Sequence, residues 1–132
     1  MNSADQKKFF IQEFQVSGDS RESFLIQKKI QRFSNKDSAN KIKILVDLKK
    51  NKSIQEKNIQ NKVTKYNLSL SADVKIIELN TLREIRRYFN ANEDYDVEDS
   101  YSNTVNNSKE ANSRLIDKIV DEILDQLRIY YN

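Results

Sequence analysis

The 132-residue sequence contains no cysteine and no histidine, and Gly18 is its only glycine. Without cysteine, the chain can form no disulfide, no thiolate nucleophile and no cysteine-bound metal site. Without histidine, it lacks the commonest general base and the basic partner of Ser-His and Cys-His nucleophile pairs. A single glycine cannot supply a glycine-rich phosphate loop, a dinucleotide fingerprint or a nucleophile elbow. We therefore expect a protein that is not an enzyme and that needs no cofactor.

Long hydrophobic runs are also lacking. No segment approaches the roughly 18–20 consecutive apolar residues of a transmembrane helix, and no basic-then-apolar signal peptide begins at Met1. Hydrophobic residues make up 37% of the chain and charged residues 33%, which favours a thin two-layer fold over a thick globule. The length predicts one domain over residues 1–132, with residues 1–8 expected to be flexible.

The small net charge of +3 conceals an uneven distribution along the chain. Residues 41–65 contain eight lysines against Asp47 and Glu56, whereas residues 91–132 contain four basic residues against ten acidic ones. A basic region of this kind attracts phosphate groups of nucleic acid, phospholipid or a lipid headgroup, and charge alone does not choose among them. The same lysines also fit the solvated face of a half-buried sheet, so both interpretations stay open.

Alternation of apolar and polar residues predicts a sheet. Residues 65–76 alternate cleanly and predict a long strand with one solvated face. Residues 42–48 alternate in the same way and predict an antiparallel neighbour, with the hairpin turn in the polar segment 51–62. A third, less regular strand is expected over residues 83–89, and the apolar run FFIQEFQV predicts a further strand over residues 9–16.

Two amphipathic helices complete the set. Asp19 or Ser20 is expected to cap the first helix, with Glu22 completing a capping box. The second is expected to run from about Asn103 to the C-terminus. Its apolar stripe contains Ile116, Ile119, Val120, Ile123, Leu127 and Tyr130. The sequence therefore predicts an α+β fold, a two-layer sandwich of order β-α-β-β-β-α, with both helices packed on one face of a small mixed sheet.

Two kinds of binding site are weighed against this framework. Four clustered carboxylates suggest a calcium site, but they lack the glycine and the regular spacing of a calcium loop, so we expect no metal. These carboxylates belong to Asp94, Asp96, Glu98 and Asp99. Arginines beside Tyr88 and Phe89 suggest nucleic-acid stacking on a sheet. The solvated face of the best strand instead carries serines, Asn67 and Asp73, which argues against a stacking platform, and we expect no nucleic acid.

Several blocks of the sequence together resemble a known family. They are SRESFLIQKKIQRFS, VTKYNLSLSADVKIIEL, EIRRYFNANEDYDV with EDSYSNTVNNSKEANSRL, and IDKIVDEILDQLRIYY. In order and spacing they resemble the first helix, central strand, final strand, connector and last helix of the lipopolysaccharide-assembly lipoprotein (LptE) family, particularly its alphaproteobacterial branch. The resemblance covers nearly the whole chain, and each block alone is a soft motif.

The resemblance implies a role that composition cannot supply. Members of this family lie at the periplasmic side of the outer membrane of Gram-negative bacteria, anchored by a lipid on an N-terminal cysteine. They plug the lumen of the LptD β-barrel, help it to fold, and bind lipopolysaccharide. We accordingly expect a signal and a lipobox cysteine to precede Asn2 in the natural protein. The runner-up is a basic α+β module that binds nucleic acid or a protein partner.

Candidate binding residues follow from this resemblance and from charge. Lipopolysaccharide headgroups carry phosphates, so lysines near the central strand are the first candidates, and arginines of the third strand the second. These residues are Lys57, Lys62, Lys65, Arg86 and Arg87. The connector before the last helix is acidic where the family carries basic residues. Its acidic residues, among them Asp94 and Asp96, are candidates to face the barrel partner or to bridge to lipid phosphate through divalent ions. Tyr95 and Tyr101 are further candidates to face the partner, although we expect them rather to pin the connector to the sheet.

Overall fold

The computed structural model describes residues 9–18 and 20–131. Within them the elements follow the predicted order β-α-β-β-β-α. They are β1 (Phe10–Ser17), α1 (Ser20–Gln31), β2 (Lys41–Lys57), β3 (Val63–Glu78), β4 (Glu84–Asp96) and α2 (Tyr101–Tyr130). The predicted flexible segment 1–8 and the predicted cap Asp19 lie outside the described residues.

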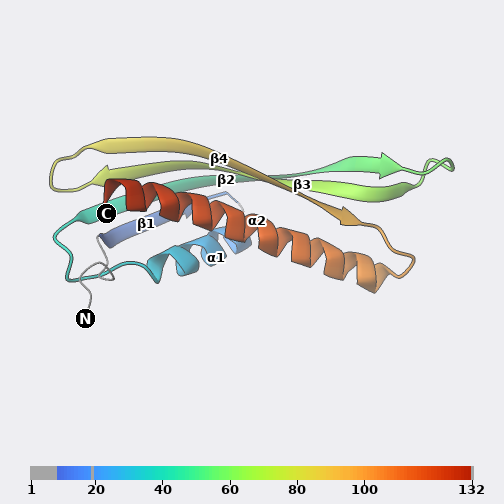
Figure 1. Cartoon of the computed structure of the whole chain (residues 1–132), viewed down its shortest axis with the longest axis horizontal. Helices are drawn as coiled ribbons and strands as arrows, with labels where there is room; N and C mark the ends of the chain where they lie inside the picture. Colours follow the sequence, from blue (N-terminus) through green and yellow to red (C-terminus); the bar gives the residue numbers. More distant parts are fainter. Residues whose placement is uncertain (1–8, 19, 132) are drawn as a thin grey trace.

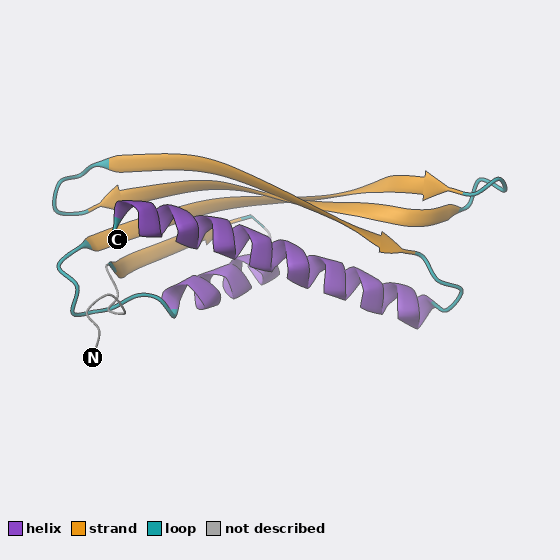
Figure 2. Ribbon diagram, viewed as in Figure 1, coloured by secondary structure: helices purple, strands orange, loops and turns teal. Residues whose placement is uncertain are grey.

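The four strands form one mixed sheet in the order β1-β2-β3-β4. β1 runs parallel to β2, because α1 carries the chain back between them, and the other two pairs are antiparallel hairpins. Figure 1 and Figure 2 show both helices on the same face of this sheet, with the other face uncovered. The predicted two-layer α+β sandwich is therefore confirmed.

The core lies between the sheet and the helices, and the predicted alternation accounts for it. Alternate residues are buried from Ile42 to Leu48 of β2 and from Leu68 to Ile76 of β3, and the residues between them are at least partly exposed. The stripe predicted on the last helix is buried from Ile116 to Leu127, although Tyr131 rather than Tyr130 closes it. The fully buried side chains with the largest volume include Ile26, Ile42, Ile44, Leu70, Leu115, Ile119 and Ile123. Nonpolar burial of this kind is the main stabilising contribution to folding.

The hairpin turn lies within the predicted segment 51–62, but two predicted strand ends are wrong. β2 does not end at residue 48: it continues to Lys57, and only the short turn after it reverses the chain. The Asn58 side chain closes this turn by accepting hydrogen bonds from the backbone N–H groups of Gln60 (2.9 Å) and Lys62 (3.0 Å). The third strand likewise runs on to Asp96, because β3 supplies a pairing partner along that whole length. The first part of the predicted acidic connector is therefore strand.

The layers do not cover each other over their full length. β1 ends at Ser17 opposite Asp47, whereas β2 continues to Lys57. Gly18 ends β1 with a φ of 104°, and a Cβ there would lie 2.1 Å from the Leu48 carbonyl oxygen, so only glycine fits. α1 then runs back under β1, while α2 spans most of the sheet (Figure 1). The outer half of β2 and the β2–β3 turn thus project beyond the core, and residues 49–57 are all exposed.

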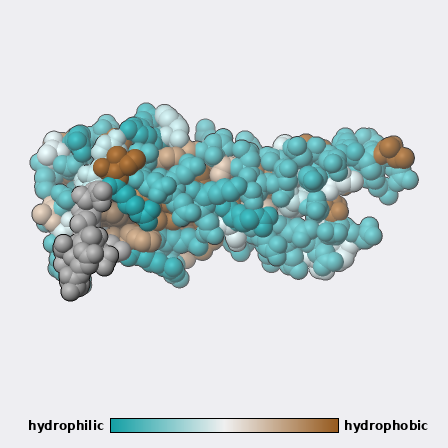
Figure 3. All heavy atoms as spheres, in the orientation of Figure 1, coloured by the Kyte–Doolittle hydropathy of each residue, from teal (hydrophilic) through white to brown (hydrophobic). Residues whose placement is uncertain are grey.

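The exterior of the described chain is mostly polar. Figure 3 shows hydrophilic side chains over most of the visible face, with a hydrophobic spot at the far tip of the β2–β3 hairpin. Ile59, in the turn, is fully exposed there. Among residues 9–18 and 20–131, neither helix is long and apolar enough to cross a membrane.

Candidate functional site

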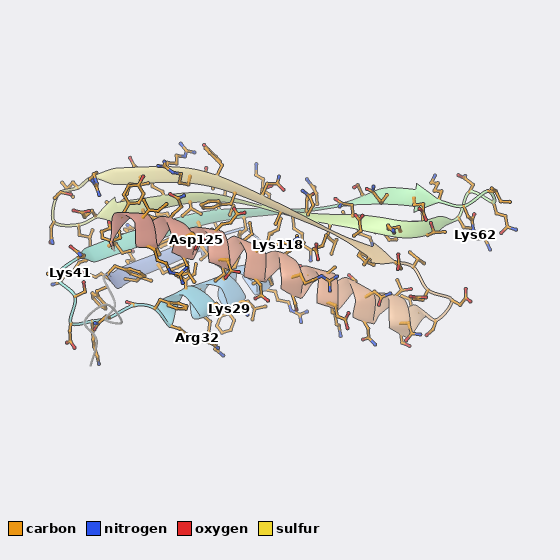
Figure 4. The ribbon with its side chains drawn as sticks, viewed as in Figure 1. Lys29, Arg32, Lys41, Lys62, Lys118 and Asp125 are labelled. Atoms are coloured by element: carbon orange, nitrogen blue, oxygen red, sulfur yellow. The ribbon has the colours of Figure 1, made fainter. Side chains whose placement is uncertain are left out.

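The three candidate lysines lie together at the projecting end of the hairpin. Lys57 ends β2, Lys65 lies near the start of β3, and Lys62 occupies the turn between them, at the tip labelled in Figure 4. The Lys65 ammonium lies 3.9 Å from an Asp96 carboxylate oxygen. Lys57 and Lys62 form no ion pair with any described residue. The hairpin therefore presents cations that are available for an anionic partner.

The two candidate arginines are not part of this group. They lie near the opposite end of β4, and because they are consecutive strand residues they point to opposite faces of the sheet. Arg86 lies on the uncovered face, where its guanidinium donates two hydrogen bonds, of 3.1 and 2.7 Å, to the Asp73 carboxylate. This bond holds the pKa of Asp73 below its usual range and raises that of Arg86. Arg87 lies on the helix side and donates a 2.6 Å hydrogen bond to the Tyr130 hydroxyl.

The four candidate partner-facing residues occupy different environments. Asp94 accepts a 2.8 Å hydrogen bond from the Asn67 side chain on the neighbouring strand. Asp96, as noted, lies beside Lys65. Tyr95 is only 6% exposed and packs against Tyr66, whereas Tyr101, at the start of α2, is 83% exposed. Tyr95 is thus a core residue of β4, and Tyr101 is a surface residue.

A contact between a lysine and two tyrosine rings, which the sequence did not predict, lies on the helix-facing side of β2. The Lys52 ammonium lies 4.1 Å from the centre of the Tyr66 ring and 5.9 Å from that of Tyr95, and the two rings are 5.6 Å apart. Such cation–π contacts favour a charged lysine over an aromatic face. Because β2 continues past Leu48, which points inward, the period of two also points Lys50 and Lys52 inward.

Lys50 belongs to a polar network around the buried Glu22. Glu22 lies in the first turn of α1 and is only 3% exposed. Its Oε1 atom accepts hydrogen bonds of 3.0 Å each from Lys50 and from the Asn112 side chain of α2. Burial raises the pKa of the Glu22 carboxyl, but these hydrogen bonds outweigh burial and leave the pKa below its usual value. Glu22 therefore joins α1, β2 and α2, instead of acting only as the predicted capping residue.

A further carboxylate, Glu93, joins β4 to α2. It binds Lys118 at 2.8 Å and also contacts Arg114, and these two hydrogen bonds lower its pKa. Lys29 of α1 similarly binds Asp117 of α2 at 2.9 Å. Part of the charge of α2 is therefore used to hold the helix against its neighbours.

The uncovered face of the sheet is polar and largely ion-paired. Lys43 binds Glu13 at 3.2 Å and Lys75 binds Glu84 at 3.1 Å, each pair joining neighbouring strands, in addition to the Arg86–Asp73 pair. A hollow of about 590 Å³ opens on this face, lined in part by Ser17, Asp47, Asp73, Lys75 and Arg86. Cross-strand pairs of this kind suit a hydrated surface more than an apolar contact.

The described residues offer charge and shape for binding. Over residues 9–18 and 20–131, no three acidic side chains are grouped so that they could hold a metal ion. A binding role can rest on three surfaces: the hairpin lysines, the region around Lys52 and the ion-paired sheet face.

Comparison with known proteins gives a fold likeness. No protein-family model matches the sequence, and no curated protein sequence matches it. Three solved structures superpose over most of both chains. Rare lipoprotein B from Shewanella oneidensis has a TM-score of 0.67 at 11% identity, covering 89% of this chain and 95% of that one. A minor lipoprotein from Acinetobacter baumannii has a TM-score of 0.61 at 16% identity, covering 92% of each chain. Lipoprotein B from Nitrosomonas europaea has a TM-score of 0.54 at 14% identity, covering 96% and 89%.

These three structures come from different bacteria and share the lipoprotein description. At identities of 11–16% the likeness concerns the backbone arrangement, and it extends over nearly the full length of each chain. The chain therefore has the fold of these bacterial lipoproteins.

Proposed function

We propose that this chain is a non-catalytic component of the outer-membrane lipopolysaccharide translocon, in which it plugs the LptD barrel and binds lipopolysaccharide. The observation that carries the proposal is the lipoprotein fold, which extends over 89% or more of this chain in each of the three comparisons. The sequence blocks that resemble the LptE family fall on elements of that fold. The full-length protein would be held on the periplasmic side of the outer membrane by an N-terminal lipid.

The surface chemistry supports a place inside a polar lumen. A plug needs an exterior with no large apolar patch, because the interior of an outer-membrane barrel is polar. The uncovered sheet face meets this need with charge pairs that join neighbouring strands, such as Lys43–Glu13 and Lys75–Glu84. A barrel wall of mixed charge would exchange hydrogen bonds with this face.

Lipopolysaccharide binding is assigned to the hairpin lysines. Lys57 and Lys62 have no ion pair among the described residues, and the Lys65–Asp96 pair is long, at 3.9 Å. These cations are therefore free to meet headgroup phosphates, with an affinity that falls as salt screens the charges. Arg86 is a weaker candidate, because its guanidinium is already bound to Asp73. Charge reversal of the three lysines together is expected to weaken lipopolysaccharide binding at low salt, and unchanged binding would remove this assignment.

Depletion of the gene tests the function in the cell. If the proposal is correct, depletion lowers the amount of folded barrel in the outer membrane, and newly made lipopolysaccharide accumulates before it reaches the surface. Complementation with the full-length gene restores surface lipopolysaccharide. Normal surface lipopolysaccharide after complete depletion would overturn the proposal.

A further inference from the structure

The projecting half of β2 has an open edge. β1 pairs with β2 only as far as the position where Ser17 lies opposite Asp47, whereas β2 continues to Lys57. From Lys49 onward, β2 therefore has β3 on one side and no described strand on the other (Figure 1). An unpaired edge of this kind exposes backbone N–H and C=O groups that can bind a further strand.

Two backbone hydrogen bonds beside the start of β2 show which groups face each side. The Asn40 carbonyl accepts a 2.8 Å hydrogen bond from Phe10 of β1, and the Lys41 carbonyl accepts a 2.9 Å hydrogen bond from Leu79, which follows β3. Backbone groups of successive strand residues face opposite sides of the strand. Even-numbered residues of β2 thus face β1, and odd-numbered residues face β3.

The same alternation places three residues on the open side. The register between β2 and β3 is regular as far as Ile54. Beyond the end of β1, the N–H and C=O groups of Lys50, Lys52 and Ile54 therefore point away from β3 into open space. No side chain within residues 9–18 and 20–131 forms a hydrogen bond with these groups. They are available to a partner backbone.

The two other edges of the sheet are better protected. On β4, side chains of α2 cover two outward-facing carbonyls, because Lys118 donates to that of Asn92 (3.3 Å) and Asn107 to that of Asp96 (3.1 Å). β1 is only eight residues long and has an irregular register after Ile11. Covering side chains, short strands and irregular registers are common ways of protecting an edge. Of the edges that the structure describes, the projecting half of β2 is the one left open.

The charge of this edge selects its partner. Residues 49–57 contain four lysines and one glutamate. Lys50 is paired with Glu22, but Lys49 and Lys52 form no ion pair within the described ranges. Like charges directly opposite each other destabilise a pair of strands, so two copies of this edge would repel each other. An acidic strand would instead be attracted.

We propose that the open edge of β2 binds an extended acidic segment of another polypeptide, which joins the sheet as an added strand. Backbone hydrogen bonds to Lys50, Lys52 and Ile54 hold the segment, and its side chains alternate between the two faces of the sheet. On the uncovered face, acidic side chains lie beside Lys49. This contact goes beyond the proposed function, because a lipid has no row of backbone donors and acceptors.

The helix side of the edge has room for the other side chains of the segment. A groove of about 390 Å³ lies there, and its lining includes Lys52 of β2, Arg21 of α1 and Lys109 of α2. Neither Arg21 nor Lys109 forms an ion pair with a residue that the structure describes. Acidic side chains on this side of the added strand therefore also meet cations.

Amide hydrogen exchange of the purified chain, measured by NMR, tests the proposal. The probe is the synthetic peptide EVDVEV with blocked ends, which is acidic and alternates like a strand. In the free chain, the amides of Lys50 and Lys52 should exchange fast, whereas those of Asn51 and Ser53, which face β3, should exchange more slowly. We expect the peptide to slow exchange at Lys50, Lys52 and Ile54 and to leave the two odd-numbered residues unchanged.

Control probes separate strand addition from charge attraction. EVDVEV with N-methylated backbone amides keeps the acidic side chains but loses the donors, and KVKVKV reverses the charge. We expect neither peptide to slow exchange at Lys50 and Lys52. Equal protection by the N-methylated peptide, by KVKVKV or by phosphatidylglycerol vesicles would overturn the proposal, because it would assign the contact to charge alone, to any extended peptide or to a lipid surface.

Matched variants test the edge itself. Ile54→Pro removes an outward N–H without changing charge, and Ile54→Thr keeps that N–H and the branched side chain. Peptide binding should weaken about tenfold or more in Ile54→Pro, since a donor is lost and the ring lies where the partner would pair, and less than about twofold in Ile54→Thr. Lys49→Gln with Lys52→Gln should weaken binding about 2- to 30-fold, and Lys28→Gln with Lys36→Gln, at exposed positions elsewhere, less than about twofold.

The variants also give results that would contradict the proposal. Circular dichroism confirms that Ile54→Pro and Ile54→Thr are folded, and equal peptide binding by the two would show that the β2 edge is not the site. Unchanged exchange at Lys50, Lys52 and Ile54 with EVDVEV in large excess would do the same. Barrel assembly in cells is measured separately, so either result leaves the proposed function standing.

Discussion

The ion pair between the buried Glu22 and the partly exposed Lys50 gives the sharpest stability prediction. Replacing Lys50 with methionine leaves a carboxylate that is 3% exposed without its cation. Removing one partner of a buried ion pair typically costs about 3–5 kcal/mol. The Lys50 side chain is 28% exposed and Asn112 still donates to Glu22, so the cost should fall to about 2–3 kcal/mol.

Equilibrium urea unfolding, followed by circular dichroism, measures this cost. With a slope of about 1–3 kcal/mol per molar urea, the midpoint of Lys50→Met should fall by about 0.7–3 M with the slope unchanged. The double variant Glu22→Leu with Lys50→Met removes both charges and should recover most of the loss, because no charge is left unpaired. If the single and double variants were equally stable, the charge of Glu22 would not depend on Lys50, and the ion pair would not be what joins α1 to β2.

The same pair predicts a dependence on pH. The pKa of Glu22 is lowered in the folded protein, so its stabilising contribution is fully present above its unfolded value of 4.5 and is lost as pH falls through the folded pKa. The stability difference between wild type and Glu22→Gln should therefore shrink on acidification from pH 6 to below pH 4. A difference that stayed constant over this range would show that ionisation of Glu22 does not stabilise the folded protein.

Three further predictions follow from single positions. Gly18→Ala should lower the free energy of unfolding by more than about 1–2 kcal/mol, the cost of a left-handed backbone for alanine, because the new Cβ would also clash with the Leu48 carbonyl oxygen. Thermal unfolding, with Ser17→Ala for comparison, measures this loss. Ile119→Ala, at a fully buried position of α2, should cost about 2–5 kcal/mol in urea unfolding, and a loss under 1 kcal/mol would contradict the packing described. The Asp73 carboxyl should titrate below its usual range by NMR, and Arg86→Gln should return its pKa toward normal, whereas an unchanged value would show that the pair is absent in solution.

Period-two alternation explains why most of the fold was predictable. It identified the inward residues of β2 and β3 up to Leu48 and Leu68, because burial on one face requires an apolar residue at every second position. The helical stripe of α2 was equally clear, since each apolar residue recurs at helical spacing. Both signals come from burial, and so they are strong wherever an element covers the core.

Where burial ends, the sequence signal ends too. Beyond Leu48 the inward positions of β2 are Lys50 and Lys52. Nothing in their chemistry distinguishes a lysine on the inward side of a projecting strand from a lysine in a turn. Pairing with β3 keeps this segment extended, and pairing is a long-range property that local composition does not encode. The network around Glu22 is missed for the same reason, because Glu22, Lys50 and Asn112 are distant in sequence and meet only after the layers pack.

Copurification with the barrel tests the central proposal most directly. The full-length protein, with its own signal, would be expressed together with the LptD barrel of the same genome and extracted in mild detergent through a tag on the barrel. We predict a stoichiometric complex that dissociates on heating. If the barrel assembles fully while this chain stays in the unbound fraction, the chain is not its plug, and the translocon role is contradicted.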